Sequence, residues 1–399
     1  MTMNLSIGER KLNLEFLLYT AIVIVSVFFR FITLGVQPLD DHEAGLALQS
    51  LRISNGEEVQ ISGQPGVIAI NSILFFLLGA SDLLARIVPA LFGVCLVLVP
   101  LLYRQWIGRS TALLLALFLA LDPLMISVSR TSDGSTLAML GLLAGIGFWL
   151  NRRPVLSGIS FGAALLGGVH LWAGLVVLVV VFLLFRKNLT SSEENVTQHH
   201  VWQVVASAAI TVLTVSTLLL LNPSGISGIG TAFVAYLTSW SQVPSVSLET
   251  VAISWLLVEL PLIIIAVWGG IHASFRKDGR MLPLVLWWVL GFIIALFNPT
   301  RSFISLYWTS IPLLLIASIG LRYVFDGLRL KQRMVVIAEA GLVVVLLVFS
   351  FLNTVNLLNS PYLAGDAYQN RLIGAVLPLI LLVAVTFLLA WGWSAASTR

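Results

Sequence analysis

The sequence predicts an all-α protein, a polytopic membrane bundle of about 12 spanning helices. Of its 399 residues, 58% are apolar and only 10% are charged, and the mean hydropathy is +1.00. A soluble domain carries roughly 25% charge, and a globule with so few charges would aggregate in water. The apolar stretches are continuous and do not alternate with polar residues, which excludes an outer-membrane barrel. The composition therefore excludes a soluble enzyme.

The first apolar run covers residues 14–36 and follows a polar leader with Arg10 and Lys11. No small-residue cleavage site follows it, so we expect an uncleaved first span and not a signal peptide. A break is expected inside 155–185, because Gly167 and Gly168 lie in its middle. The remaining predicted spans are 83–103, 110–126, 134–150, 155–169, 171–185, 201–221, 249–271, 281–297, 302–322, 334–353 and 372–393.

The run at 66–80 is an exception, because about 15 residues are short for a span. If it does not cross and the N-terminus is cytoplasmic, 16 of the 22 Lys and Arg residues fall on one side, as the positive-inside rule requires. We therefore expect a re-entrant or interfacial helix on the outer face. The prediction is a single transmembrane domain over 1–399, with both termini cytoplasmic and outer loops at 37–82, which holds the interfacial helices, and 222–248.

The net charge, the single cysteine and the absence of a phosphate-binding loop exclude several other classes of function. The net charge of +4 is too small and too scattered for nucleic-acid binding. The one cysteine, Cys95, lies in an apolar run, which excludes an internal disulfide and a cysteine-based metal site. The chain has no glycine-rich phosphate loop. No cofactor is expected; a divalent metal is compatible with the acidic residues but is not implied by them.

Charged residues concentrate on the predicted outer face. Ionisable groups near membrane depth are costly unless they are paired or functional, so this concentration indicates a polar cavity that opens outward. Ordinary ion pairs of outer loops are the alternative. The outer residues are Arg30, Arg52, Arg86, Arg130, Arg301, Arg371, Asp40, Asp41, Glu43, Glu57, Glu58, Asp82, Asp122, Asp133 and Asp366.

The densest polar stretch is Pro-Leu-Asp-Asp-His-Glu-Ala, which ends at Ala44, just after the first span. Three carboxylates and an imidazole within four residues cannot all be charged at low cost in a partly buried site. One of them would then have a raised pKa, which suits a general base. The alternative is that Asp40 or Asp41 caps a helix that starts near Glu43. Capping and catalysis are compatible, so both remain open.

The order of several short motifs resembles the C-type, multi-span glycosyltransferases. It is similar above all to the group of the protein mannosyltransferases and the lipid A aminoarabinose transferase. The motifs, in order, are Arg30 late in the first span, Pro-x-x-x-x-Glu43-Ala, Leu-Leu-Gly-Ala-Ser-Asp-Leu-Leu-Ala-Arg86, Tyr-Arg-Gln-Trp-Ile-Gly-Arg109, Leu-Asp-Pro123, Ser-Arg130-Thr-Ser-Asp133 and Asn-Pro-Thr-Arg301-Ser-Phe-Ile-Ser-Leu-Tyr307.

The resemblance implies roles for the acidic residues. In this family an Asp-Glu pair after the first span supplies the base that deprotonates the acceptor. Glu43 matches the glutamate, but His42 stands where the family has aspartate, and Asp41 lies one residue earlier. The family's His-Pro-Pro stretch is also replaced, by Gly63-Gln64-Pro65-Gly66. Either Asp41 acts after a one-residue shift, or His42 acts, or the site is inactive.

The resemblance also implies that outer-face arginines hold the lipid-linked phosphate. Arginine binds phosphate through paired N–H groups. Arg301 is the first choice for this role and Arg130 or Arg86 the second. Asp133 and Tyr307 belong to the same predicted substrate site.

The predicted function is transfer of a sugar from a polyprenyl-phosphate donor to an acceptor at the outer face of a cell membrane, and the predicted location is the cytoplasmic membrane of a bacterium. The alternative is a non-catalytic accessory subunit of the same fold within a larger membrane complex. A transporter would need polar residues at mid-membrane. It ranks last, because only Glu259 and Glu339 lie well within predicted spans and inverted repeats are not found. The expected partners are the donor lipid and membrane lipids, with no nucleic acid, and membrane proteins if the chain is a subunit.

Overall fold

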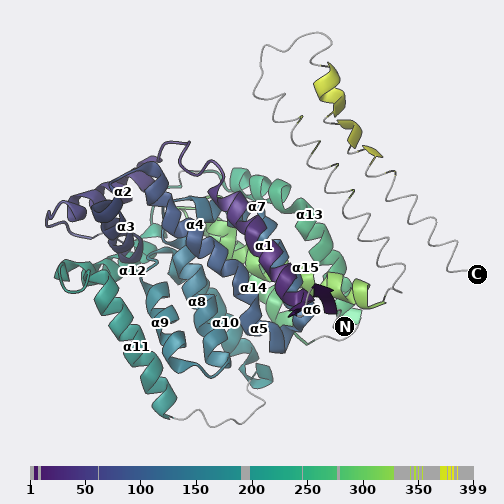
Figure 1. Ribbon diagram of the computed structural model, residues 1–399, viewed down its shortest axis with the longest axis horizontal. Helices are drawn as coiled ribbons and strands as arrows, with labels where there is room; N and C mark the ends of the chain where they lie inside the picture. Colours follow the sequence, from purple (N-terminus) through teal and green to yellow (C-terminus); the bar gives the residue numbers. More distant parts are fainter. Residues whose placement is uncertain are drawn as a thin grey trace, which may run out of the picture. The chain divides into compact units, whose positions relative to one another are not determined.

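The computed structural model describes residues 4–7, 10–61, 63–189, 198–244, 246–275 and 279–327, and isolated positions between 342 and 384. The chain forms two compact units, Met1–Tyr323 and Val324–Arg399 (Figure 1). The prediction of one continuous domain stays a prediction. Most of the predicted spans 334–353 and 372–393, and the predicted outer residue Asp366, lie outside the described residues.

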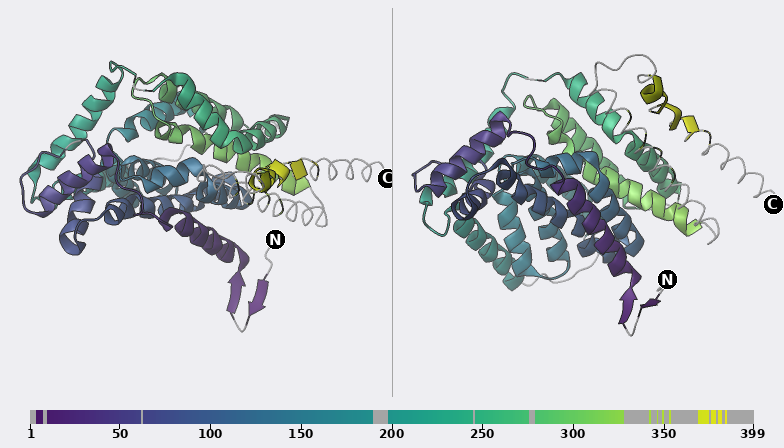
Figure 2. Two further views of the ribbon diagram at one scale, coloured as in Figure 1. Left: turned by 90° about the horizontal axis from the view of Figure 1, so that it is seen from above. Right: turned by 45° about the horizontal axis from the view of Figure 1, so that its top comes forward.

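Helices dominate the first unit, after a short hairpin that the sequence did not predict. Strands β1 (Asn4–Ile7) and β2 (Arg10–Asn13) pair antiparallel, with Asn4 opposite Asn13. The hairpin projects from the start of helix α1, Leu14–Phe31 (Figure 2). Helix α1 ends before the apolar run does, and Thr33 just after it has a φ of 54°.

Two helices follow α1 in the predicted first outer loop and pack against each other. They are α2 (Asp41–Ser54) and α3 (Pro65–Leu78). Helix α3 is apolar but only 14 residues long, and it buries one face while Phe76 and Leu78 stay exposed. Ser81 then caps α4 (Asp82–Leu98), by accepting a hydrogen bond from the Leu84 amide, and α5 (Pro100–Ile107) continues it.

Helices α6 (Arg109–Leu121) and α7 (Pro123–Arg130) are bent by 58° at Asp122. The local sequence explains the bend. Proline is favoured at the first position of a helix, and the Asp122 carboxylate caps α7 by accepting from the Met125 amide at 2.8 Å. The buried Arg30 guanidinium donates to the carbonyl of Leu119 at 2.9 Å. It thereby binds α1 to the C-terminal turn of α6, where the helix dipole favours a cation.

Small residues let the next helices approach closely. They are α8 (Ser135–Leu150), α9 (Pro154–Leu165) and α10 (His170–Leu189). A Cβ on Gly134 would lie 2.2 Å from the carbonyl oxygen of Gly167, and one on Gly141 would lie 2.5 Å from the amide of Ala164. The predicted break at Gly167 and Gly168 is confirmed, because α9 ends before it and α10 begins after it.

The rest of the unit carries the second predicted outer loop. Helix α11 (Gln198–Ser216) packs along α9. It is followed by η1 (Pro223–Ile226) and α12 (Ser227–Ser239), which occupy the loop. Helices α13 (Leu248–Phe275), α14 (Met281–Phe297), η2 (Ile304–Leu306) and α15 (Tyr307–Gly327) complete the described helices.

The helical membrane architecture is confirmed, but the count of about 12 spans is not. By length and composition, three helical segments of the described residues could cross a membrane: Asp82–Ile107, Leu248–Ile271 and Ile304–Tyr323. The bent pair α6 and α7 would make a fourth. Other apolar helices are shorter, at 10–17 residues.

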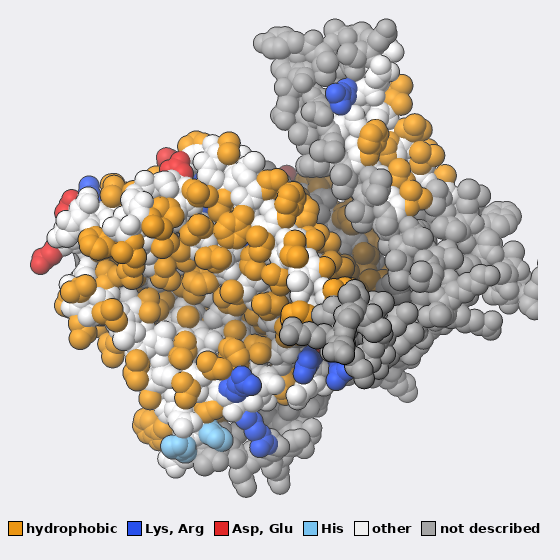
Figure 3. All heavy atoms as spheres, viewed as in Figure 1, with side chains coloured by type: hydrophobic (Ala, Val, Ile, Leu, Met, Phe, Trp, Pro, Cys, Tyr) orange, Lys and Arg blue, Asp and Glu red, His pale blue; other side chains and the backbone are white. Residues whose placement is uncertain are grey.

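Charge is segregated across the first unit. Figure 3 shows acidic side chains gathered at the end where α2 and α3 lie and most basic ones at the opposite end, with hydrophobic side chains covering the surface between. A hydrophobic belt between two polar ends is what a bilayer requires. The positive-inside rule predicts that the basic end faces the cytoplasm, and this orientation stays a prediction.

This segregation predicts which ends a membrane-impermeant thiol reagent reaches in whole cells. In a Cys95→Ser background, we expect labelling of Glu58→Cys, at the acidic end, and none of Arg153→Cys, at the basic end, until the membrane is permeabilised. Both positions are exposed. The reverse labelling pattern would overturn the orientation.

Candidate functional site

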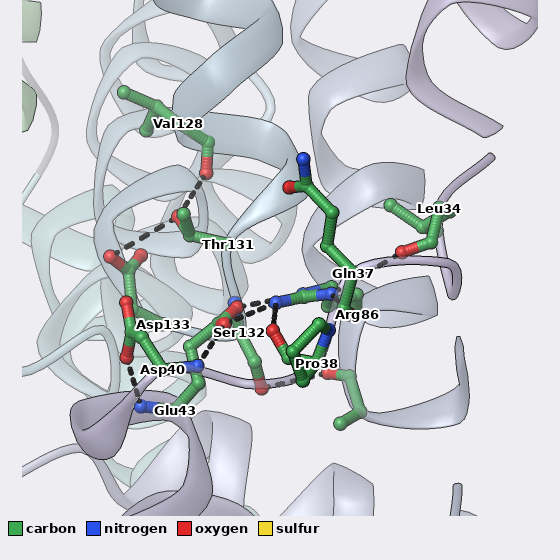
Figure 4. A network of polar contacts seen from close by, with 11 residues as sticks. Leu34, Gln37, Pro38, Asp40, Glu43, Arg86, Val128, Thr131, Ser132 and Asp133 are labelled. Carbon is green, nitrogen blue, oxygen red and sulfur yellow. Dashed lines mark hydrogen bonds and ion pairs between the residues drawn. The ribbon is translucent and has the colours of Figure 1, made fainter. Parts of the chain in front are cut away.

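A buried ion pair between Glu43 and Arg86 organises the acidic end of the first unit (Figure 4). The Glu43 side chain is 3% exposed and that of Arg86 is 8% exposed. Arg86 Nε donates to Glu43 Oε1 at 2.9 Å, and Arg86 Nη2 donates to Glu43 Oε2. Both oxygens of the carboxylate therefore face the guanidinium, which is the bidentate geometry that arginine favours. The pair joins the first turn of α2 to the first turns of α4.

The remaining N–H groups of Arg86 hold the segment between α1 and α2. Nη1 donates to the carbonyl of Gln37 at 2.6 Å and to that of Leu34 at 3.4 Å. Nη2 also donates to the carbonyl of Pro38 at 3.0 Å. A guanidinium has five N–H donors, and here all five are used within the chain. In this structure Arg86 thus has no N–H group free for the donor phosphate, for which the resemblance made it a second choice, and its contacts are those of a residue that holds the fold. Its phosphate role stays a prediction.

The predicted helix cap is confirmed for Asp40. Its carboxylate accepts from the Glu43 amide at 2.8 Å, and Glu43 Oε2 accepts from the Asp40 amide at 3.1 Å, a complete capping box. Burial alone would raise the pKa of Glu43. Hydrogen bonds from Arg86 and from the amides of Ser132 and Asp40 outweigh burial and hold that pKa below its ordinary value. Glu43 therefore stays an anion, and the raised pKa expected of a base does not arise at this residue.

The same carboxylate fixes the start of α8. Glu43 Oε1 accepts from the Ser132 amide at 2.6 Å, and the Ser132 hydroxyl donates to the carbonyl of Ala85 at 2.8 Å. The next residue, Asp133, is 5% exposed and accepts from both the amide and the hydroxyl of Ser135. Asp133 thus holds the first turn of α8. It directly follows Ser132, whose amide binds Glu43, so this predicted substrate residue lies close to the ion pair.

The two residues that depart from the family pattern contact each other. Gln64 Nε2 lies 3.2 Å from His42 Nε2, and Gln64 Oε1 accepts from the Gly134 amide at 2.7 Å. Because the Gly134 N–H fixes the oxygen of the Gln64 amide, the amide nitrogen faces His42 and donates to it. Nε2 of His42 is then the acceptor of this hydrogen bond. In this arrangement the Nε2 lone pair of His42 is engaged, which disfavours His42 as the base.

His170 links a further group of polar residues to His42 and Asp133. His170, the first residue of α10, interacts electrostatically with both Asp133 and His42. Its carbonyl accepts from the hydroxyl of Tyr307 at 2.7 Å and from the indole of Trp308 at 2.9 Å. Tyr307, a predicted substrate residue, is 1% exposed. Its hydroxyl therefore holds the start of α10.

The other two predicted phosphate ligands, Arg130 and Arg301, donate to backbone carbonyls. Within the part of the chain that the structure describes, these bonds leave some of their N–H groups unused. Arg130 Nη1 donates to the carbonyls of Phe29 and Ile32, at 2.9 and 2.8 Å, and so caps the end of α1. Arg301 Nε donates to the carbonyl of Val246 at 2.9 Å, and its Nη1 donates to that of Leu296 at 3.2 Å. Both side chains are half-buried. The η2 segment just after Arg301 contacts α7, the helix that ends in Arg130.

Asp41 differs from its neighbours. It is exposed on the first turn of α2, and among the described residues no hydrogen bond or ion pair engages its carboxylate. It adjoins Asp40, which is committed to the cap, and His42, which is committed to Gln64. Asp41 is thus the one carboxylate of this acidic motif that is open to a proton from outside the chain.

Sequence reasoning missed His170 and gave Gln64 no role other than as a departure from the family pattern. A histidine inside the apolar stretch 155–185 was the available signal, because ionisable residues at such positions are usually functional. Metal binding gains no support: no group of three or more acidic, histidine or cysteine side chains in the described part of the chain could hold an ion.

The fold is that of known glycosyltransferases. The sequence matches no protein-family model and no curated protein sequence. The structure is similar to ArnT from Cupriavidus metallidurans bound to undecaprenyl phosphate, with a TM-score of 0.60 and 19% identity over 94% of this chain and 72% of that one. It is also similar to the oligosaccharyltransferase AglB from Archaeoglobus fulgidus in complex with an inhibitory peptide and a dolichol-phosphate, with a TM-score of 0.55 and 14% identity over 95% of this chain and 56% of AglB. The resemblance to C-type glycosyltransferases is therefore confirmed for the fold.

The ion pair predicts a large loss of stability when one partner is removed. Glu43→Gln should lower the free energy of unfolding by about 3–5 kcal/mol, because it leaves the buried Arg86 charge unpaired. The matched control is Glu57→Gln in the exposed pair Arg52–Glu57, at 4.0 Å, which should cost less than about 1 kcal/mol. Thermal unfolding in detergent micelles measures both. Equal effects of the two substitutions would contradict the assigned role.

The same comparison has a pH signature. The folded-state pKa of Glu43 is lowered, so its stabilisation is fully present above the unfolded value of about 4.3 and is lost as pH falls through the folded value. The stability difference between wild type and Glu43→Gln should thus be constant near neutrality and shrink below about pH 4.

The double variant Glu43→Gln/Arg86→Met should be more stable than Glu43→Gln alone, since no buried charge is left unpaired.

Proposed function

We propose that this chain transfers a sugar from a polyprenyl-phosphate donor to an acceptor at the outer face of a membrane. The observation that carries the proposal is the exposed, uncommitted Asp41 carboxylate, held beside a rigid ion pair at the acidic end of the chain. The likeness of the fold to proteins bound to undecaprenyl phosphate and to a dolichol-phosphate supports a lipid-linked donor.

The proposed reaction is a single displacement. The oxygen of an acceptor hydroxyl attacks the anomeric carbon of the sugar, and the bond from that carbon to the phosphate oxygen breaks. The polyprenyl phosphate leaves with the bonding electron pair, and the Asp41 carboxylate takes the hydroxyl proton. Arg301 neutralises the leaving phosphate, because part of its guanidinium is not engaged with the carbonyls of Val246 and Leu296. No cofactor is required by this chemistry.

Asp41 is a better candidate for the base than its neighbours. Glu43 is buried and held as an anion by Arg86, so it positions α2 and does not take the proton. His42 accepts from Gln64 through Nε2. The one-residue shift from the family pattern leaves an exposed aspartate on the first turn of α2.

The proposal includes a membrane orientation. The chain is proposed to cross the membrane about 12 times, with α2 and α3 in the membrane plane and both termini in the cytoplasm. In this orientation the donor phosphate lies at the acidic end and its prenyl chain lies along the hydrophobic belt. A bacterial cytoplasmic membrane is the proposed location, and the donor lipid and membrane lipids are the proposed partners. The charge segregation of the first unit supports this orientation.

The base assignment predicts a specific loss of activity. Asp41→Asn keeps the shape of the side chain but removes the proton acceptor, and turnover should fall by about 10²–10⁴-fold. Asp40→Asn is the matched control, because asparagine caps a helix as well as aspartate does, and its turnover should be nearly unchanged. Release of labelled sugar from a polyprenyl-phosphate donor measures both. Full activity of Asp41→Asn, with a decline as pH falls through about 6.5, would assign the base to His42 instead.

The phosphate assignment predicts a binding defect. Arg301→Ala should raise the KM for the donor lipid by about tenfold or more, because a charge-assisted hydrogen bond is lost. Arg301→Lys should recover part of the affinity, since it restores the charge but not the planar pair of donors. An unchanged donor KM in a folded Arg301→Ala protein would rule out this assignment.

A non-catalytic accessory subunit is the second candidate. It is favoured by the contact between His42 and Gln64, which occupies both positions that depart from the family pattern, and by the full use of Arg86 within the chain. A subunit of this kind would co-purify in stoichiometric amounts with membrane-protein partners. It would also show no donor turnover in either the wild type or Asp41→Asn.

A further inference from the structure

A groove of about 1100 Å³ opens between α3 and the end of α11. Most of its wall area is apolar, and its volume lies just above the usual range for ligand sites, about 300–1,000 Å³. The lining residues that matter for the argument are Ile73, Phe76 and Leu77 from α3, and Val215, Leu218 and Leu219 from the end of α11 and the residues after it. An alkyl chain is the chemistry that such walls bind.

One end of the groove is polar and acidic. Glu57 and Glu58, in the segment after α2, line it together with the amide side chains of Gln60 and Asn222. Both glutamates are exposed, and among the described residues no ion pair engages Glu58. Glu57 lies 4.0 Å from the exposed side chain of Arg52, which does not line the groove. No Lys, Arg or His side chain of the described residues lines the groove.

This charge pattern argues against a phosphate. An anionic head group at the polar end would be repelled by the two carboxylates and would find no cation among the lining residues. A protonated amine fits, because it would be attracted by the carboxylates and can donate three hydrogen bonds to them and to nearby carbonyls. The side-chain carbonyl oxygens of Gln60 and Asn222 are further acceptors at this end.

We propose that the groove binds a membrane amphiphile with a primary amine in its head group, with the alkyl chain between α3 and α11 and the amine at Glu57 and Glu58. The site is separate from the ion pair of Glu43. Ser54, which lines the groove, lies eleven positions after Glu43 in α2, which is about 16 Å along a helix axis. Binding does not depend on the transfer reaction, so the two proposals can fail independently.

The experiment uses three photoreactive amphiphiles with the same diazirine-bearing alkyl chain and an amine, a hydroxyl or a phosphate head. Each is titrated into the purified full chain in detergent micelles, and the adducts are mapped by mass spectrometry. We expect the amine probe to label residues of α3 and α11 at the lowest concentration and the phosphate probe at the highest. The double variant Glu57→Gln/Glu58→Gln should lower the apparent affinity for the amine probe by about fivefold.

Matched variants separate the groove from general lipid contact. Glu249→Gln removes an exposed carboxylate outside the groove and should leave amine labelling unchanged. Ile73→Trp should fill the groove and abolish labelling, whereas Leu78→Trp, an exposed position on α3 that does not line it, should not. Equal labelling by all three probes, or preference for the phosphate, would overturn the proposal. So would amine labelling that Glu57→Gln/Glu58→Gln leaves unchanged.

Discussion

The acidic end of this protein depends on one buried ion pair, Glu43 with Arg86. Two charges removed from water are stable only when each hydrogen-bonding group finds a partner, and here the guanidinium uses all five of its donors. The pair ties three places together: the segment after α1, the first turn of α2 and the start of α4. Through the Ser132 amide the carboxylate also fixes the entry to α8. Elements far apart in the sequence are thus held in one arrangement by a single carboxylate.

Because of this ion pair, the residues of the acidic motif have different roles. Asp40 and Glu43 are used for the cap and the ion pair, so they set the position of α2 and cannot move without breaking it. His42 is tied to Gln64, and Gln64 is tied to the Gly134 amide. Asp41 is left on a rigid turn with its carboxylate exposed. A reactive group on an immobile element is what positioning for catalysis requires.

Two substitutions that each look unfavourable when the sequence is compared with the family pattern can compensate each other when their side chains are in contact. His42 and Gln64 each depart from the family pattern, and alone each weakens the case for an active site. Their side chains hydrogen-bond to each other, so the two positions form one local unit with its own geometry. Gln64 supplies a donor to His42 and an acceptor to Gly134, which leaves both polar ends of a buried amide satisfied.

The sequence by itself determined the membrane class, the helical architecture, the family resemblance, the break at Gly167 and a cap by Asp40 or Asp41, which the structure assigns to Asp40. These follow from composition, local periodicity and short-range hydrogen bonding, which neighbouring residues decide. Only the tertiary structure decided that Arg86 is consumed within the chain, that His42 meets Gln64, and that His170 lies near Asp133. The number of donors left to a guanidinium depends on which carbonyls and carboxylates the fold brings to it, and those come from residues 43 to 52 positions away. No local pattern in a sequence records that proximity.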